Sequence, residues 1–214
     1  MAEHRLPALH AVTDDAVLAR PDFLGLAGAV LAAGGRDVAL HLRGPASGGR
    51  FLYELAEPLA RAADRHGALF VVNDRVDVAL AVGAGGVQLG RGSVLPADAR
   101  RVLGGGPLVA VSVGSTAEIR DAAQRGADFV LAGSVFPTAT HPGRGGMGSG
   151  GLREMAALGI PTVAIGGITP ERVAEVRAAG ARGVAAIRAV WDADDPARAV
   201  ERFLEAWKDA DADD

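Results

Sequence analysis

The segment FPTATHPGRGG, Phe136 to Gly146, gathers hydroxyl, imidazole and guanidinium side chains directly after an apolar run. Thr138 and Thr140 can donate hydroxyl hydrogen bonds to a phosphate, and Arg144 adds positive charge. His141 could also transfer a proton near neutral pH. The segment is predicted to be a ligand loop for an anion, and the alternative is a solvated loop with no role in binding.

A second pattern suited to phosphate is IGGIT, residues 165–169. Gly166 and Gly167 follow an apolar run, and paired glycines let backbone N–H groups approach a phosphate closely at the start of a helix. The alternative is a tight turn in which Thr169 caps the helix and Pro170 is its first residue. The two interpretations are compatible, and we predict a phosphate-binding turn.

Two further motifs carry charged and amide side chains. In VALHLR, His41 and Arg43 fall on one face of a strand, where Arg43 suits phosphate or carboxylate and His41 is interpreted as a hydrogen-bonded interior residue. In NDR, Asn73 can donate to a ligand oxygen and Asp74 can bind Mg²⁺. The alternative for Asp74 is the N-cap of the helix that follows, with Arg75 paired to a nearby aspartate.

Eight short apolar runs, each followed by an amphipathic segment, must position these side chains. The runs cover residues 9–14, 38–43, 68–73, 86–89, 108–113, 129–135, 162–167 and 183–188. Strands buried on both faces read as continuous apolar runs, as in parallel sheets. Eight such units predict a (β/α)₈ barrel of the TIM type, in the α/β class. A doubly wound sheet is the alternative, but it would more often have a Gly-rich turn where this chain has TDDAVLARPD.

In such a barrel the site lies at the carboxyl ends of the strands. Polar or flexible residues fall at these ends in nearly every run, which predicts a ring-shaped site. The candidates for substrate or phosphate binding are Arg43, Asn73, Gln88, Ser112, Thr138, Thr140, Arg144, Gly166, Gly167 and Arg188, with Ser134 at the end of the sixth run.

Composition limits the remaining possibilities. The 214 residues are 49% hydrophobic and are expected to form one domain over 1–214, with a frayed acidic tail at 209–214. A net charge of −4 without a basic cluster argues against nucleic acid. The absence of cysteine excludes disulfides and thiolate metal sites. No run has the length of a membrane span and no signal core precedes the first run, so a cytoplasmic protein is expected.

The motifs LHAVTDD, HLR, NDRVDVAL, GVQL, VSV, VFPTATHPGRG and VAIGGITPERV occur together in one order. In this order they resemble the thiamine phosphate synthase / thiazole tautomerase superfamily, from Leu9 to about Trp191. The resemblance implies a (β/α)₈ barrel that binds a small phosphorylated heterocycle.

The synthase branch of that superfamily joins a hydroxymethylpyrimidine pyrophosphate to a thiazole phosphate and releases pyrophosphate, with Mg²⁺. The resemblance carries its Asn-Asp pair over to Asn73 and Asp74. Three positions depart from its pattern: Pro45 and His141 stand where that branch has lysines, and Gly90-Arg91-Gly92-Ser93 lacks the second magnesium carboxylate.

The tautomerase branch moves a double bond in a thiazole carboxylate phosphate, which needs proton transfer and a phosphate grip but no metal. Several strings, including LHAVTDD and DFVLAGSVF, are more similar to this branch. Its catalytic histidine falls at Ser134 in this chain, and His141 is the nearest substitute base.

From the sequence we therefore predict a tautomerase-like enzyme, with His141 and Ser134 as catalytic candidates and no cofactor. The first alternative is a divergent synthase in which Asp74 alone holds Mg²⁺. The second is a non-catalytic protein that binds or senses a thiamine precursor. The expected partner is the small-molecule substrate, with neither nucleic acid nor a membrane, and the sequence is compatible with a homo-oligomer.

Overall fold

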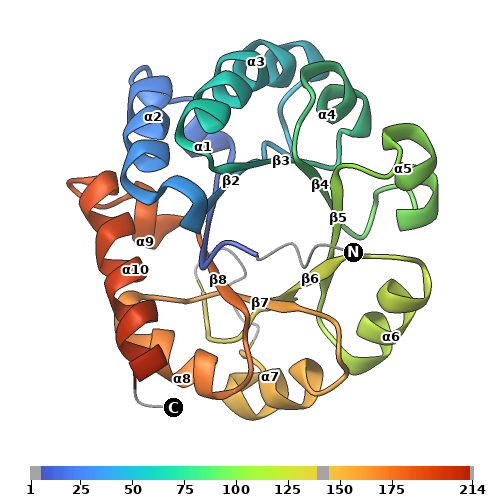
Figure 1. Cartoon of the computed structure of the whole chain (residues 1–214), viewed down its shortest axis with the longest axis vertical. Helices are drawn as coiled ribbons and strands as arrows, with labels where there is room; N and C mark the ends of the chain where they lie inside the picture. The colour runs from blue at the N-terminus through green and yellow to red at the C-terminus, as the bar shows by residue number, and fades with distance from the viewer. Residues whose placement is uncertain (1–5, 139–144, 213–214) are drawn as a thin grey trace.

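Eight parallel strands of the computed structural model close into a barrel in chain order (Figure 1). The structure describes residues 6–138 and 145–212. The strands are β1 (Leu9–Val12), β2 (Val38–Leu42), β3 (Leu69–Asn73), β4 (Gly86–Leu89), β5 (Leu108–Val113), β6 (Phe129–Gly133), β7 (Thr162–Ile165) and β8 (Gly183–Ala186). Since β1 pairs with both β2 and β8, the predicted (β/α)₈ barrel is confirmed and the doubly wound sheet is wrong.

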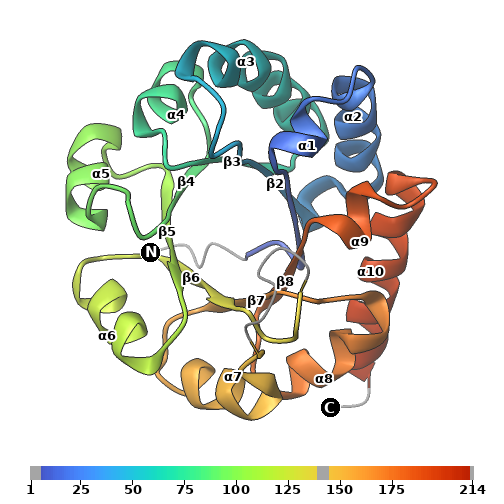
Figure 2. The same cartoon turned by 180° about the vertical axis from the view of Figure 1, so that it is seen from behind.

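Helices cover the barrel on its outside (Figures 1 and 2). They are α1 (Asp15–Leu18), α2 (Phe23–Gly34), α3 (Gly49–His66), α4 (Val76–Val82), α5 (Pro96–Leu103), α6 (Thr116–Gln124), α7 (Gly148–Ala156), α8 (Val173–Ala178), α9 (Arg188–Trp191) and α10 (Pro196–Ala212), with 3₁₀ turns η1 (Gly35–Asp37) and η2 (Pro170–Arg172). The alternation of side chains along each strand divides the core in two. One buried cluster, containing Phe129, Leu131 and Val163, fills the barrel, and the larger one packs between strands and helices.

Several strands end one or two residues earlier than the sequence predicts. β7 stops at Ile165 because Gly166 and Gly167 have φ values of 102° and 65°, which no extended strand accommodates. β1 stops at Val12, and the Thr13 hydroxyl that follows it accepts from the N–H of Arg43, just after β2. The residues that leave the sheet early are therefore the ones that form the rim of the barrel mouth.

Helix ends follow the signals in the sequence more closely. α3 ends at His66, and Gly67 takes the left-handed conformation at φ 67° as its C-cap, as expected for a glycine that follows a helix. The pattern that begins at Pro170 splits into η2 and α8. α10 continues to Ala212, so the expected tail is helical over residues 209–212, and residues 213–214 lie outside the described part of the chain.

Trp191 fixes the short helix α9 to the barrel. Its side chain is fully buried, its Nε1–H donates to the Val12 carbonyl at 2.8 Å, and its ring packs against Phe23 with centroids 5.7 Å apart. Arg20 donates to the Trp191 carbonyl at 2.7 Å. These contacts hold Arg188, the first residue of α9, at the mouth of the barrel. Over the described residues, the helices are too short or too polar to cross a membrane.

Candidate functional site

A row of three polar side chains crosses the inner wall of the mouth. Asn73 on β3 donates from Nδ2 to Gln88 Oε1 on β4, and Gln88 donates from Nε2 to Ser112 Oγ on β5. Asn73 and Gln88 are buried, and Ser112 is half-buried. The structure therefore brings together three residues that the sequence placed only at neighbouring strand ends.

Two buried histidines extend this row toward β1. His10 Nδ1 lies 2.8 Å from His41 Nε2, both side chains are fully buried, and the His10 ring packs on Phe129 at 5.6 Å. The prediction that His41 is an interior residue is confirmed. His10 was missed by sequence reasoning, although its two-residue spacing from Val12 places it on the same inward face.

Burial of these two histidines makes the stability of the fold depend on pH. Desolvation lowers the pKa of His41 from 6.5 to about 4 and holds the pKa of His10 well below its usual value. The unfolded chain takes up a proton as pH falls through 6.5, whereas folded His41 stays neutral until about pH 4. Stability should therefore fall over that window, by about 3 kcal/mol for His41 alone.

Urea unfolding at pH 7 and pH 4.5 measures this loss. His41→Gln, which has no titratable group, should remove most of the His41 share of the pH dependence. An unchanged pH dependence in that variant would contradict the assignment.

Asp74 has an unusual backbone and a fixed carboxylate. It is a non-glycine residue at φ 62°, and its Oδ1 accepts from Gly90 N–H at 2.7 Å and from the Ser93 hydroxyl. The N-cap of α4 is Arg75, so the interpretation of Asp74 as the cap is wrong: its side chain turns across to the loop after β4. Arg75 pairs with Asp77 as the sequence suggested. Left-handed backbone in a residue other than glycine is typical of functional loops.

The donor set at Asp74 decides whether Mg²⁺ fits. Among residues 6–138 and 145–212, no cluster of three or more His, Asp or Glu side chains could hold a metal ion. Asp74 is nevertheless exposed at the mouth, and both anchoring contacts fall on Oδ1. Mg²⁺ is commonly bound by one or two carboxylates together with substrate phosphates and water. The site therefore fits a magnesium ion that arrives with a phosphorylated substrate.

Arg43 is held at the rim of the mouth by its backbone. Its N–H donates to the Thr13 hydroxyl at 2.8 Å, and that hydroxyl lies 2.9 Å from the Arg43 carbonyl. Its side chain is half-buried and has neither a hydrogen bond nor an ion pair within the part of the chain that the structure describes. A guanidinium with a fixed backbone and no internal partner suits an anionic ligand.

The Gly166–Gly167 turn lies against the segment after β6. A Cβ on Gly166 would come within 2.7 Å of Ser134, and one on Gly167 within 2.7 Å of the Pro137 carbonyl. Arg172 donates to the Gly167 carbonyl at 2.7 Å. The N–H groups of both glycines find no acceptor among the described residues. The turn is thus fixed by packing while its donors remain available to a ligand.

Thr169 and Pro170 take the N-cap and first positions of η2, as predicted, although the Thr169 side chain makes no capping hydrogen bond.

The remaining candidates are only partly placed. Ser134 is half-buried beside Gly166, and its hydroxyl contacts no base within the described ranges. Thr138 is half-buried just after it. Thr140, His141 and Arg144 lie outside the described residues, so their roles remain predictions.

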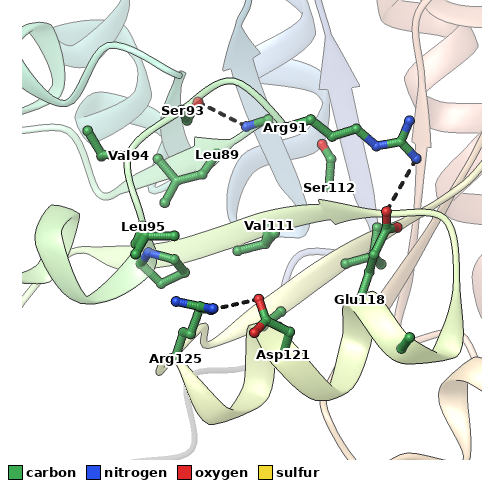
Figure 3. Close-up of a pocket in the computed structure, with 15 residues that line it drawn as sticks. Leu89, Arg91, Ser93, Val94, Leu95, Val111, Ser112, Glu118, Asp121 and Arg125 are labelled. Carbon is green, nitrogen blue, oxygen red and sulfur yellow. Dashed lines mark hydrogen bonds and ion pairs between the residues drawn. The ribbon is translucent and has the colours of Figure 1, made fainter.

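Two cavities flank the mouth. The smaller, of about 160 Å³, includes Arg188 with Asp14 and Asp192, and Arg188 is exposed. The larger, of about 410 Å³, opens between α5 and α6 beside β4 and β5 (Figure 3). In Figure 3 the Arg91 side chain passes over Ser112 to Glu118, with which it forms an ion pair at 3.5 Å. The sequence did not indicate this pair.

The closed parallel barrel, with hydroxyl, amide and guanidinium side chains at its mouth, defines a (β/α)₈ protein with a polar site at the carboxyl ends of its strands. The family model described as thiamine monophosphate synthase matches residues 9–190. The chain belongs to this family of thiamine-biosynthesis proteins.

Three relatives illustrate the similarity. The thiamine-phosphate synthase of Mycobacterium sp. (strain KMS) is 41% identical over 201 residues, covering 90% of this chain and 89% of the relative. That of Methanoculleus marisnigri is 45% identical over 184 residues, covering 85% and 86%. The solved structure of a thiamine phosphate pyrophosphorylase from Pyrococcus furiosus superposes with a TM-score of 0.83 at 34% identity, covering 96% and 97%. These relatives support the synthase alternative, and they do not support the tautomerase-like function that we preferred from the sequence.

Proposed function

We propose that this protein is a thiamine phosphate synthase, which joins hydroxymethylpyrimidine pyrophosphate to thiazole phosphate and releases pyrophosphate. The observation that carries the proposal is that side chains and backbone donors suited to phosphate groups or their Mg²⁺ lie on two separate sides of the mouth. Arg43 and Asp74 follow β2 and β3, whereas the Gly166–Gly167 turn and Arg188 follow β7 and β8 on the opposite side of the barrel (Figure 1).

Two sides of this kind favour a synthase over a tautomerase. A tautomerase acts on one phosphorylated molecule and needs one phosphate grip and a base. A synthase must hold two phosphorylated molecules at once and align their reacting atoms, which is an effect of proximity and charge more than of proton transfer.

The residues then divide into three groups by position. Arg43 is suited to bind the pyrophosphate and to stabilise it as it leaves. The N–H groups of Gly166 and Gly167 are suited to bind the thiazole phosphate. Ser112 lies on the wall between the two sides and would orient a heterocycle by a hydrogen bond, while the buried Asn73 and Gln88 hold it in place. Mg²⁺, held by Asp74 with phosphate oxygens, would neutralise the charge of the leaving group.

A coupled assay tests the proposal directly. The purified protein is incubated with both substrates, with and without Mg²⁺, and pyrophosphate and thiamine phosphate are measured. We expect both products in equal amounts and only when Mg²⁺ and both substrates are present. Metal-free isomerisation of the thiazole carboxylate phosphate would favour the tautomerase, and binding without any turnover would favour the non-catalytic protein.

Arg43→Ala should weaken the binding of the pyrimidine pyrophosphate, because it removes a charged hydrogen bond of about 1–3 kcal/mol, roughly 5- to 150-fold in affinity. Titration calorimetry measures the change. Arg50→Ala is the matched control, since Arg50 is exposed on α3 and pairs with Glu54 at 2.8 Å. Equal affinity in Arg43→Ala and Arg50→Ala would place Arg43 outside the site.

A further inference from the structure

The buried histidine pair continues into the polar row of the mouth. In the order of the strands, His10, His41, Asn73, Gln88 and Ser112 come from β1 to β5, one residue from each. Hydrogen bonds join the first two residues and the last three. Only Ser112, at one end, is open enough to meet a ligand, because the other four side chains are at most 6% exposed.

Three atoms in this series lack a partner. They are His10 Nε2, His41 Nδ1 and Asn73 Oδ1. Buried polar atoms without partners are costly, and each of them calls for an explanation. Two of the three belong to His41 on β2 and Asn73 on β3. A hydrogen bond between these two side chains is the one link that the row lacks between neighbouring strands.

The amide of Asn73 sets the direction of that missing contact. Asn73 uses its Nδ2 as a donor to Gln88, and its atom without a partner is Oδ1, an acceptor. Burial lowers the pKa of His41, and hydrogen bonding with Asn73 acts against that effect. A neutral His41 that donates to Oδ1 must have its single proton on Nδ1. Its Nε2 is then an acceptor for His10 Nδ1–H, at the observed 2.8 Å.

We propose that His10 and His41 are positioning residues that polarise this row in one direction and thereby make Ser112 a hydrogen-bond donor to the substrate. With the proton of each ring on Nδ1, every bond in the row would run from His10 toward the mouth, and Gln88 donates to the Ser112 oxygen. The Ser112 proton is then directed to the ligand, which must present an acceptor there, such as a ring nitrogen. The inference rests on the proposed function only for the identity of that ligand.

The opposite polarity is the specific competitor. The Pro7 backbone acts to raise the pKa of His10, although His10 Nε2 has no acceptor within hydrogen-bond distance. If His10 Nε2–H donated to Pro7, His41 would have its proton on Nε2. Every bond in the row would then reverse, with both amides turned over, and Ser112 would donate to Gln88. The tautomers of the two neutral histidines therefore decide the direction in which the hydrogen bonds of the row are donated.

Long-range ¹H–¹⁵N spectra at pH 7 read these tautomers without any substrate. The resonances are assigned from their loss in His10→Leu and His41→Gln. We expect both rings to have the proton on Nδ1, which is the opposite of what the reversed row requires. A proton on Nε2 of His41 would overturn the proposal. Because no ligand is involved, this outcome is independent of whether the synthase assay succeeds.

A double-mutant cycle on binding of hydroxymethylpyrimidine pyrophosphate tests the effect on Ser112. Ser112→Ala should weaken binding by about 10-fold, the scale of one hydrogen bond. His41→Leu, which breaks the row, should weaken it similarly, and the double variant should lose little more than either single one. His41→Gln can donate to Asn73 and accept from His10, so it should bind within about 3-fold of wild type.

Thr162→Val is the matched control for a generally weakened fold. Thr162 is a buried hydroxyl that donates to Ile160 at 3.0 Å and points away from this row. The Thr162→Val variant should have a lower melting temperature and an unchanged affinity for hydroxymethylpyrimidine pyrophosphate. Additive losses in the His41–Ser112 cycle, or failure of His41→Gln to restore binding, would overturn the proposal. If the wild-type protein binds no pyrimidine pyrophosphate, the proposed function falls and the tautomers alone decide this inference.

Discussion

Asp74→Asn should abolish most of the Mg²⁺-dependent pyrophosphate release and leave the fold intact. Asparagine retains an Oδ1 that can accept from Gly90 and Ser93, and it tolerates the left-handed backbone at φ 62°. What it removes is the negative charge that, in the proposed function, would hold the cation. We expect the turnover rate to fall by about 10²–10³-fold, the usual range when one preorganised electrostatic group is lost. The free energy of unfolding should change by about 1 kcal/mol or less.

Asp77→Asn gives the matched comparison. Asp77 lies three residues further along, in the first turn of α4, and pairs with Arg75 on the surface. Loss of an exposed ion pair costs at most about 1 kcal/mol and should leave turnover unchanged. Asp74→Ala adds a second effect, because it also frees the loop at Gly90. Full activity of Asp74→Asn with Mg²⁺ would exclude this carboxylate as the metal ligand.

The eight strands could be predicted from the sequence, with their ends correct to within two residues, because parallel strands buried on both faces leave a continuous apolar pattern. Arg43, Asn73, Gln88 and Ser112 each follow or close such a run, and all four lie at the mouth. Knowing that parallel strands end at the same edge was enough to group them. Which of them touch was not available from the sequence, because contact depends on the register between neighbouring strands.

Two parts of the site were beyond sequence reasoning for different reasons. The alternative role of Asp74 as an N-cap was wrong because capping is a local rule, whereas its carboxylate is held by Gly90 and Ser93 from the next loop. His10 was overlooked because a histidine in an apolar strand looks like any interior residue. Its pairing with His41 arises only when β1 and β2 lie side by side in the barrel.

The preference for a tautomerase came from local strings, while the comparisons that support a synthase extend over most of the chain. The positions that depart from the synthase pattern explain why the sequence favoured a tautomerase while the comparisons favour a synthase. Pro45 and Ser93 depart from the synthase pattern, but Ser93 still holds Asp74 in place. Asp74 therefore retains its orientation without a second carboxylate, and a single carboxylate is sufficient where substrate phosphates supply the other oxygens.

Gly166→Ala should destabilise the protein more than any other alanine substitution in the β7 turn except Gly167→Ala. Two separate costs add at this position. The backbone has φ 102°, which a residue with a Cβ rarely adopts, at about 1–3 kcal/mol. The new Cβ would also lie 2.7 Å from the Cα and Cβ of Ser134, and overpacking of this kind costs about 1–3 kcal/mol. We expect a loss of about 2–5 kcal/mol in urea unfolding.

Two other glycines separate these costs. Gly159 has φ 87° with nothing near its Cβ position, so Gly159→Ala should show the backbone cost alone. Gly150 lies in α7 with ordinary backbone and open space, and Gly150→Ala should stabilise the protein by up to about 1 kcal/mol. The expected order of stability is Gly150→Ala, Gly159→Ala, Gly166→Ala. If Gly166→Ala lost no more stability than Gly159→Ala, the new Cβ would be accommodated beside Ser134 at no cost. The segment after β6 would then not hold the turn in place. In the proposed function the Gly166–Gly167 turn binds the thiazole phosphate. Gly166→Ala should therefore also weaken thiazole phosphate binding, whereas Gly159→Ala should not.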